Sequence, residues 1–166
     1  MRPIIAVDPG AKGALVAMNS QGLIEIFDVP LILEYGSKKT VDVDAVRTWV
    51  KKIDPAFVVF ELVHDAPKDG KSSGGNFMKN FAALIGACAG YKRKYIIPSQ
   101  WKAYSGLVGK VKDMSLVRVA KEYPAAARFL VGAKNPVDRA DAILLGRYAM
   151  FKWRLEYGTT ERHSGE

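Results

Sequence analysis

Cysteine and histidine are scarce in this sequence. Its 166 residues include one cysteine, Cys88, and two histidines. A single cysteine can neither form an internal disulfide nor build a cysteine-rich metal site. Because Cys88 lies in an apolar stretch, residues 81–89, we expect a buried thiol in a protein that works in a reducing compartment.

Long hydrophobic runs are also missing. No run approaches the roughly 20 apolar residues of a membrane span. Residues 1–3 lead directly into a strand-like segment rather than into a signal peptide. We therefore expect a cytoplasmic protein with no membrane partner.

Acidic residues are outnumbered by basic ones, 17 against 25, which gives a formal net charge of +8. Such an excess favours a polyanionic partner, with nucleic acid first and an acidic membrane surface second. An ordinary basic protein with a solvated surface remains the alternative. The length suits one domain, and 49% hydrophobic residues are enough to fill its core.

The order of apolar segments predicts one α/β domain. Strand-like runs at residues 4–8, 14–18 and 23–29 open the chain, and the turn at 19–22 makes them an antiparallel meander. The continuous apolar run at 56–60 is typical of a strand that is covered on both faces. A short strand is expected at 95–97, and helices at 42–53, 76–89, 100–104, 114–122 and 138–153.

The connecting segments follow from their composition. Residues 34–40 and the glycine-rich, basic residues 65–75 are expected to be loops, and Ser99 is expected to cap the helix that follows it. We assign residues 1–155 to a single domain and residues 156–166 to a polar, disordered tail.

Acidic residues occupy three sites in the predicted fold, which are the ends of two buried strands and the core-facing side of one helix. Asp8 and Glu61 each end an apolar strand, and adjacent strands would place them side by side. Asp138 and Asp141 are three residues apart, so they share one face of a helix, and Leu145 continues that face toward the sheet.

Four carboxylates that converge cannot all stay ionised without cations. With oxygen ligands and no cysteine cluster, Mg²⁺ or Mn²⁺ is the expected ion, and two such ions form the usual clamp for phosphodiester cleavage. Each residue also has an ordinary alternative. Asp8 could cap a turn, Glu61 could pair with a lysine, Asp138 could be a helix N-cap, and Asp141 could interact with the helix dipole.

Six segments in the same order resemble the RuvC family of Holliday-junction resolvases, within the ribonuclease H-like superfamily. They are "IIAVDPGAKGALVAM", "FVVFELV", "LIGACAG", "IIPSQWK", "VGKVKDMSLVRVA" and "NPVDRADAILLGRYA".

The resemblance implies a ribonuclease H-like domain with a mixed five-stranded sheet flanked by helices. It implies that Asp8, Glu61, Asp138 and Asp141 are catalytic metal ligands for two Mg²⁺ ions, with Mn²⁺ as a substitute. It places Lys112 beside them as a catalytic lysine. The implied activity is a crossover junction endodeoxyribonuclease of DNA recombination and repair, which cuts four-way DNA by paired nicks as a homodimer and leaves 5′-phosphate ends.

The sequence also departs from the family. An aromatic residue often follows the catalytic glutamate by three positions, but His64 stands there. The glycine-rich loop is longer and more basic than expected. These departures suggest a divergent member of the family, in a bacterial cell or encoded by a phage.

Basic residues are expected to bind the DNA backbone around the acidic site. We expect Lys92, Arg93 and Lys94 near the site as well, and the DNA-binding set proper is Lys68, Lys71, Lys79, Lys110 and Lys112.

Other functions remain open from the sequence. The same chemistry could act on forks, flaps or RNA–DNA hybrids, and a protein that binds junctions without cutting them is a further alternative. A phosphotransferase of the actin and hexokinase type also has an aspartate and glycines after a strand, but the chain is short for that two-domain fold.

Overall fold

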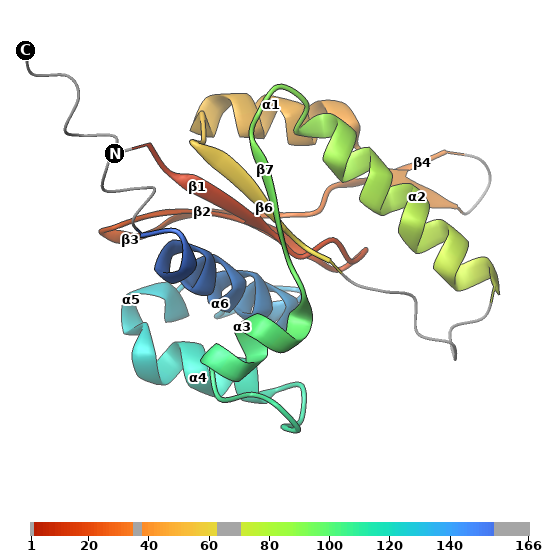
Figure 1. Cartoon of the computed structure of the whole chain (residues 1–166). Coiled ribbons are helices and arrows are strands. Elements are labelled where there is room, and N and C mark those ends of the chain that lie inside the picture. The colour runs from red at the N-terminus through yellow and green to blue at the C-terminus, as the bar shows by residue number, and fades with distance from the viewer. Residues whose placement is uncertain (1, 35–37, 63–70, 155–166) are drawn as a thin grey trace, which may run out of the picture.

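A computed structural model gives the structure of residues 2–34, 38–62 and 71–154, and of residues 71–73 it gives the backbone alone. A five-stranded mixed sheet, in the order β3-β2-β1-β6-β7, forms its centre (Figure 1). The predicted antiparallel meander is confirmed. The first and fourth predicted strands are parallel neighbours, which meets the condition for Asp8 and Glu61 to lie at one edge. The strands are β1 (Ile4–Val7), β2 (Ala14–Asn19), β3 (Gly22–Asp28), β6 (Phe57–Glu61) and β7 (Arg93–Ile96).

Helices cover both faces of this sheet, as Figure 1 shows. The first face carries α1 (Val43–Ile53) and α2 (Lys71–Ala87). The second face carries α3 (Pro98–Tyr104), α4 (Met114–Glu122), α5 (Pro124–Ala127) and α6 (Pro136–Lys152). No helix within the described ranges is long and apolar enough to cross a bilayer.

The two central strands are buried on both faces. Ile4 and Val59 face the core beneath α6, whereas Ile5 and Val58 face the core beneath α1 and α2. All four are fully buried, which explains why these strands are continuously apolar rather than alternating. Cys88 is buried in the second core, as expected, and burial raises the pKa of its thiol to about 12.

Gly146 allows α6 to lie unusually close to the sheet. A Cβ at this position would lie 2.7 Å from the Met18 sulfur and 3.2 Å from the Ala6 Cβ. Distances this short are not tolerated in a packed core. The missing side chain therefore lets the helix that carries Asp138 and Asp141 approach β1 and β2.

Several predicted boundaries were wrong. Residues 34–40 are not all loop, because β4 (Leu31–Leu33) pairs with β5 (Lys39–Val41). The predicted loop at 65–75 gives way to α2 at Lys71, and the 65–70 part lies outside the described residues. The α3 helix begins at Pro98, whose fixed φ suits a first helical position, so Ser99 is inside the helix and does not cap it. The predicted domain boundary near residue 155 also lies outside the described residues.

Candidate metal and nucleic-acid site

Asp8 leaves the end of β1 through a tight turn. Its backbone N–H donates to the Ala14 carbonyl at 3.0 Å, and the Gly13 N–H donates to the Gly10 carbonyl at 2.8 Å. A Cβ on Gly13 would overlap the Asp8 carbonyl oxygen. The Gly10 N–H also donates to Asp8 Oδ1 at 3.4 Å. The Asp8 carboxylate therefore stabilises its turn, as the turn-capping alternative predicted. It also lies close enough to Glu61, Asp138 and Asp141 to be affected by their charges.

Glu61 ends the adjacent parallel strand, and its side chain is held by an indole. Val7 is opposite Phe60 in the sheet, so Asp8 and Glu61 follow at the same edge. Glu61 has only 9% of its surface exposed, and Trp101 in α3 donates its Nε1–H to Glu61 Oε1 at 2.7 Å. Its hydrogen bond thus goes to an indole and not to a lysine. Burial raises the pKa of the Glu61 carboxyl, and the hydrogen bond from Trp101 and the charges of Lys102 and Lys112 oppose that rise.

The second pair of carboxylates comes from the first turns of α6. Asp138 and Asp141 face the end of β1, and their charges contribute to the raised pKa of Asp8. Asp138 is not the N-cap, because Asn135 holds that position. Arg139 lies between them and donates to both carboxylate oxygens of Asp28 at 2.6 and 2.7 Å, which ties this end of α6 to the end of β3.

Burial and mutual repulsion act together on these carboxyls. Burial first, and then the charge of Glu61, raise the pKa of Asp8 to about 8. Burial raises the pKa of Asp141 to about 6 although the nearby Ser115 hydroxyl acts to lower it, and burial also raises the pKa of Glu61. A cluster of acids that hold their protons this strongly is short of positive charge.

Lys112 supplies part of that charge. Its Nζ lies 2.9 Å from Asp138 Oδ1, and this hydrogen bond, followed by the charges of Asp138, Asp141 and Asp8, raises the pKa of the lysine. The structure thus brings Lys112 to the carboxylates, in the position that the resemblance implied.

The side chains of the acidic cluster are not arranged as a complete set of metal ligands. Across residues 2–34, 38–62 and 71–154, no three acidic, histidine or cysteine side chains converge tightly enough to hold an ion as they stand. Three of the oxygens already accept hydrogen bonds, from Gly10, from Trp101 and from Lys112. The chemistry of the group nevertheless fits a hard divalent cation, because every donor is an oxygen and added positive charge would relieve the raised pKa values.

An open cavity of about 380 Å³ adjoins the acidic cluster. Its wall includes Trp101 and Asp141 together with three lysines, which are Lys102, Lys110 and Lys112. A hollow lined by three lysines and next to the acidic cluster suits a phosphate-bearing ligand.

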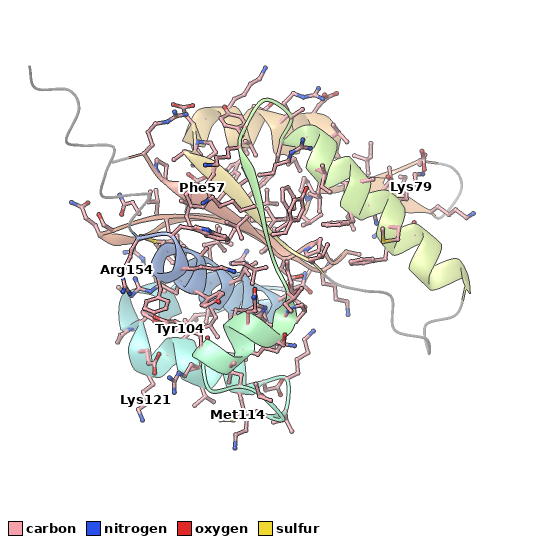
Figure 2. All side chains as sticks on the ribbon, in the orientation of Figure 1. Phe57, Lys79, Tyr104, Met114, Lys121 and Arg154 are labelled. Carbon is pink, nitrogen blue, oxygen red and sulfur yellow. The ribbon has the colours of Figure 1, made fainter. Side chains whose placement is uncertain are left out.

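The other predicted basic residues do not all lie here. Arg93 is opposite Val58, three residues before Glu61, so the expectation that residues 92–94 surround the site is wrong. Lys79 lies on α2, across the sheet from Met114 and Tyr104 (Figure 2), and it forms an ion pair with Glu34. Lys68, His64 and the side chain of Lys71 are outside the described part of the chain.

Sequence reasoning missed the residues that support the carboxylates. A lone tryptophan such as Trp101 predicts only a packing residue, and no sequence pattern assigns a role to Ser115, Arg139 or Lys102. The signals were weak, because an indole in a short helix or an arginine between two aspartates has many ordinary uses. Their partners are 26 to 111 positions away in the chain, and only the tertiary structure brings them together.

The fold is ribonuclease H-like, and it is the fold of RuvC. A solved structure entitled "T. thermophilus RuvC in complex with Holliday junction substrate" matches with a TM-score of 0.63 at 15% identity, over 92% of this chain and 96% of that one. A second structure of Thermus thermophilus RuvC matches with a TM-score of 0.61 at 17% identity, over 93% and 96% of the two chains. No family model and no curated protein sequence matches the chain. At these identities the likeness establishes the shared fold.

Proposed function

We propose that this protein is a metal-dependent endonuclease that cuts branched DNA, with four-way junctions as its substrate. The observation that carries the proposal is the acidic cluster, in which carboxylates from β1, β6 and α6 interact at one edge of the sheet. Support also comes from the fold, since one of the matched structures is a RuvC protein bound to a Holliday junction.

The residues divide into ligands and cations. Asp8, Glu61, Asp138 and Asp141 would hold two divalent ions, Mg²⁺ or Mn²⁺. When bound, such ions activate the attacking water and stabilise the leaving 3′ oxygen, which leaves 5′-phosphate ends. Lys112 is already paired with Asp138 and neutralises charge at the place where a phosphate would enter. Lys110 and Lys102 line the adjacent cavity and would contact the backbone of the DNA.

Paired cuts require two sites, and we propose that a homodimer supplies them. The face of α2 that points away from the core has small or flexible side chains at Met78, Ala82 and Gly86, all of them exposed. Ala83 is partly buried against the core, so Ala82→Glu is the better test of this interface. Light scattering should show a wild-type dimer and an Ala82→Glu monomer, with Ala120→Glu on the exposed side of α4 as the matched control.

The proposal is tested with a panel of end-labelled four-way, forked, flapped, linear and RNA–DNA hybrid substrates. In Mg²⁺ the wild type should cut the four-way DNA at paired positions, whereas in Ca²⁺ it should bind without cutting. Asp8→Asn and Asp141→Asn should abolish cutting and keep binding. Asp44→Asn, an exposed acid on α1, should cut like the wild type.

Each other result has a definite meaning. Equal cutting of forks, flaps or hybrids would broaden the proposed substrate and leave the proposed metal-dependent cleavage in place. Binding of junctions without cutting by the wild type in Mg²⁺ and Mn²⁺ would contradict the nuclease proposal.

A further inference from the structure

Trp101 contacts the acidic cluster directly, through a hydrogen bond to Glu61. It donates its only polar hydrogen to Glu61 Oε1 at 2.7 Å, and only 1% of its surface is exposed. An indole N–H is an uncharged donor that neither accepts nor titrates. The donor of this bond therefore does not change with pH.

The backbone next to Glu61 and the side chain of Trp101 are both held in place by their neighbours. Glu61 is in β6 opposite Ile96, and the Leu62 N–H donates to the Ile96 carbonyl at 2.8 Å, which fixes the backbone on both sides of the glutamate. The α3 helix follows β7 almost at once, with Ile97 as its N-cap and Pro98 in its first turn. Trp101 is then buried in the core cluster beneath α6.

One oxygen of Glu61 is thus committed to the indole. A ligand that chelates through both oxygens would have to compete with this hydrogen bond, whereas a ligand that needs one oxygen can use Oε2. Ca²⁺ takes six to eight oxygens and often binds carboxylates through both oxygens, while Mg²⁺ requires compact octahedral geometry and is bound through single oxygens and water.

We propose that Trp101 is a positioning residue that restricts Glu61 to ligation through one oxygen and thereby favours Mg²⁺ over Ca²⁺ at this site. The inference rests on the proposed metal-dependent function and goes beyond it, because it assigns the choice of ion to a side chain that binds no ion itself.

Trp101→Phe tests the inference, because it keeps most of the ring volume and removes the donor. The chain offers a matched control in Trp49, which donates to Glu25 Oε1 at 2.7 Å on the α1 side of the molecule. Trp49→Phe loses the same kind of hydrogen bond far from the acidic cluster. Both variants are checked for folding by thermal unfolding in the absence of divalent ions.

The readout is the affinity for the ions alone. Bound Mn²⁺ is followed by electron paramagnetic resonance and displaced with Mg²⁺ and, separately, with Ca²⁺. The ratio of Ca²⁺ to Mg²⁺ affinity should rise about three-fold or more in Trp101→Phe, because Glu61 can then chelate through both oxygens. The ratio should not change in Trp49→Phe. An unchanged ratio in folded Trp101→Phe would overturn the inference and leave the metal site in place.

A second measurement uses the wild-type chain and does not depend on a variant that folds. The indole N–H resonance of Trp101 should stay shifted and protected from solvent exchange as Mg²⁺ saturates the protein. If Mg²⁺ abolishes that protection, the indole does not hold Glu61 in the loaded state and the inference is wrong. If the wild type binds no Mn²⁺, the proposed metal function fails and the inference fails with it.

Discussion

Asp8→Asn should change how the stability of the metal-free protein depends on pH. The pKa of Asp8 rises from 3.8 to about 8 in the folded protein, chiefly through burial and then through repulsion from Glu61. Between these two values the folded chain keeps a proton that the unfolded chain releases. The free energy of unfolding of the wild type therefore falls as pH rises from about 4, and this loss is complete near pH 8.

The size of the effect follows from the shift. Each pKa unit corresponds to about 1.36 kcal/mol, so a shift of about four units sets a ceiling of about 6 kcal/mol. Asp8 is partly exposed and its neighbours share the proton, so we expect about 2 to 4 kcal/mol of this. Asparagine cannot ionise, and the variant avoids this loss while keeping the shape of the side chain.

Urea unfolding in a chelating buffer measures the difference directly. The stability of Asp8→Asn minus that of the wild type should be near its minimum at pH 4 and should grow by about 2 to 4 kcal/mol by pH 8. Added Mg²⁺ should stabilise the wild type far more than the variant, since a ligand stabilises only the state that binds it. Asp44→Asn should follow the wild type throughout. A difference that stays constant from pH 4 to pH 8 would refute the reasoning.

Three further substitutions test separate parts of the account. Lys112→Ala should lower the rate of single-turnover cleavage at saturating protein by about ten-fold or more, while junction affinity changes by less than about 1.4 kcal/mol. If the affinity falls and the saturated rate does not change, Lys112 is only a contact to the DNA backbone. Gly146→Ala should destabilise the chain by about 1 to 3 kcal/mol and reduce cleavage, whereas Gly75→Ala, where a Cβ meets nothing within 4 Å, should not destabilise it. Lys110→Ala should reduce the salt dependence of junction binding by about one unit of slope, with Lys51→Ala on α1 as the control; an equal slope in both would exclude Lys110 as a phosphate contact.

The sequence predicted the two buried strands that underlie the site, each a continuous apolar run that ends in an acid. Their adjacency was a condition, and the structure meets it: β1 and β6 are parallel neighbours with Asp8 and Glu61 at the same edge. The spacing of Asp138 and Asp141 gave their shared helix face, because helical periodicity is local information. Neither inference required knowledge of how the helices are packed.

The parts that sequence missed depend on tertiary contacts. The first turn of α2 is glycine-rich and has no apolar periodicity, yet the helix begins at Lys71. The same helix is anchored further on by buried Asn80, whose Oδ1 accepts from the Val41 N–H at 3.3 Å, and packing of this kind outweighs weak local propensity. The role of Trp101 depends on where α3 lies relative to β6, and no short stretch of sequence contains that information.

The central claim is that the carboxylates of β1, β6 and α6 form a divalent-metal site. Anomalous diffraction from crystals soaked in Mn²⁺ tests this most directly. Mn²⁺ peaks should lie within coordination distance of Asp8 and Asp141, with Glu61 bound through Oε2, and these peaks should be lost in Asp8→Asn. Crystals that diffract well and show no Mn²⁺ at these carboxylates, from a protein that cuts four-way DNA in the same Mn²⁺ buffer, would contradict it.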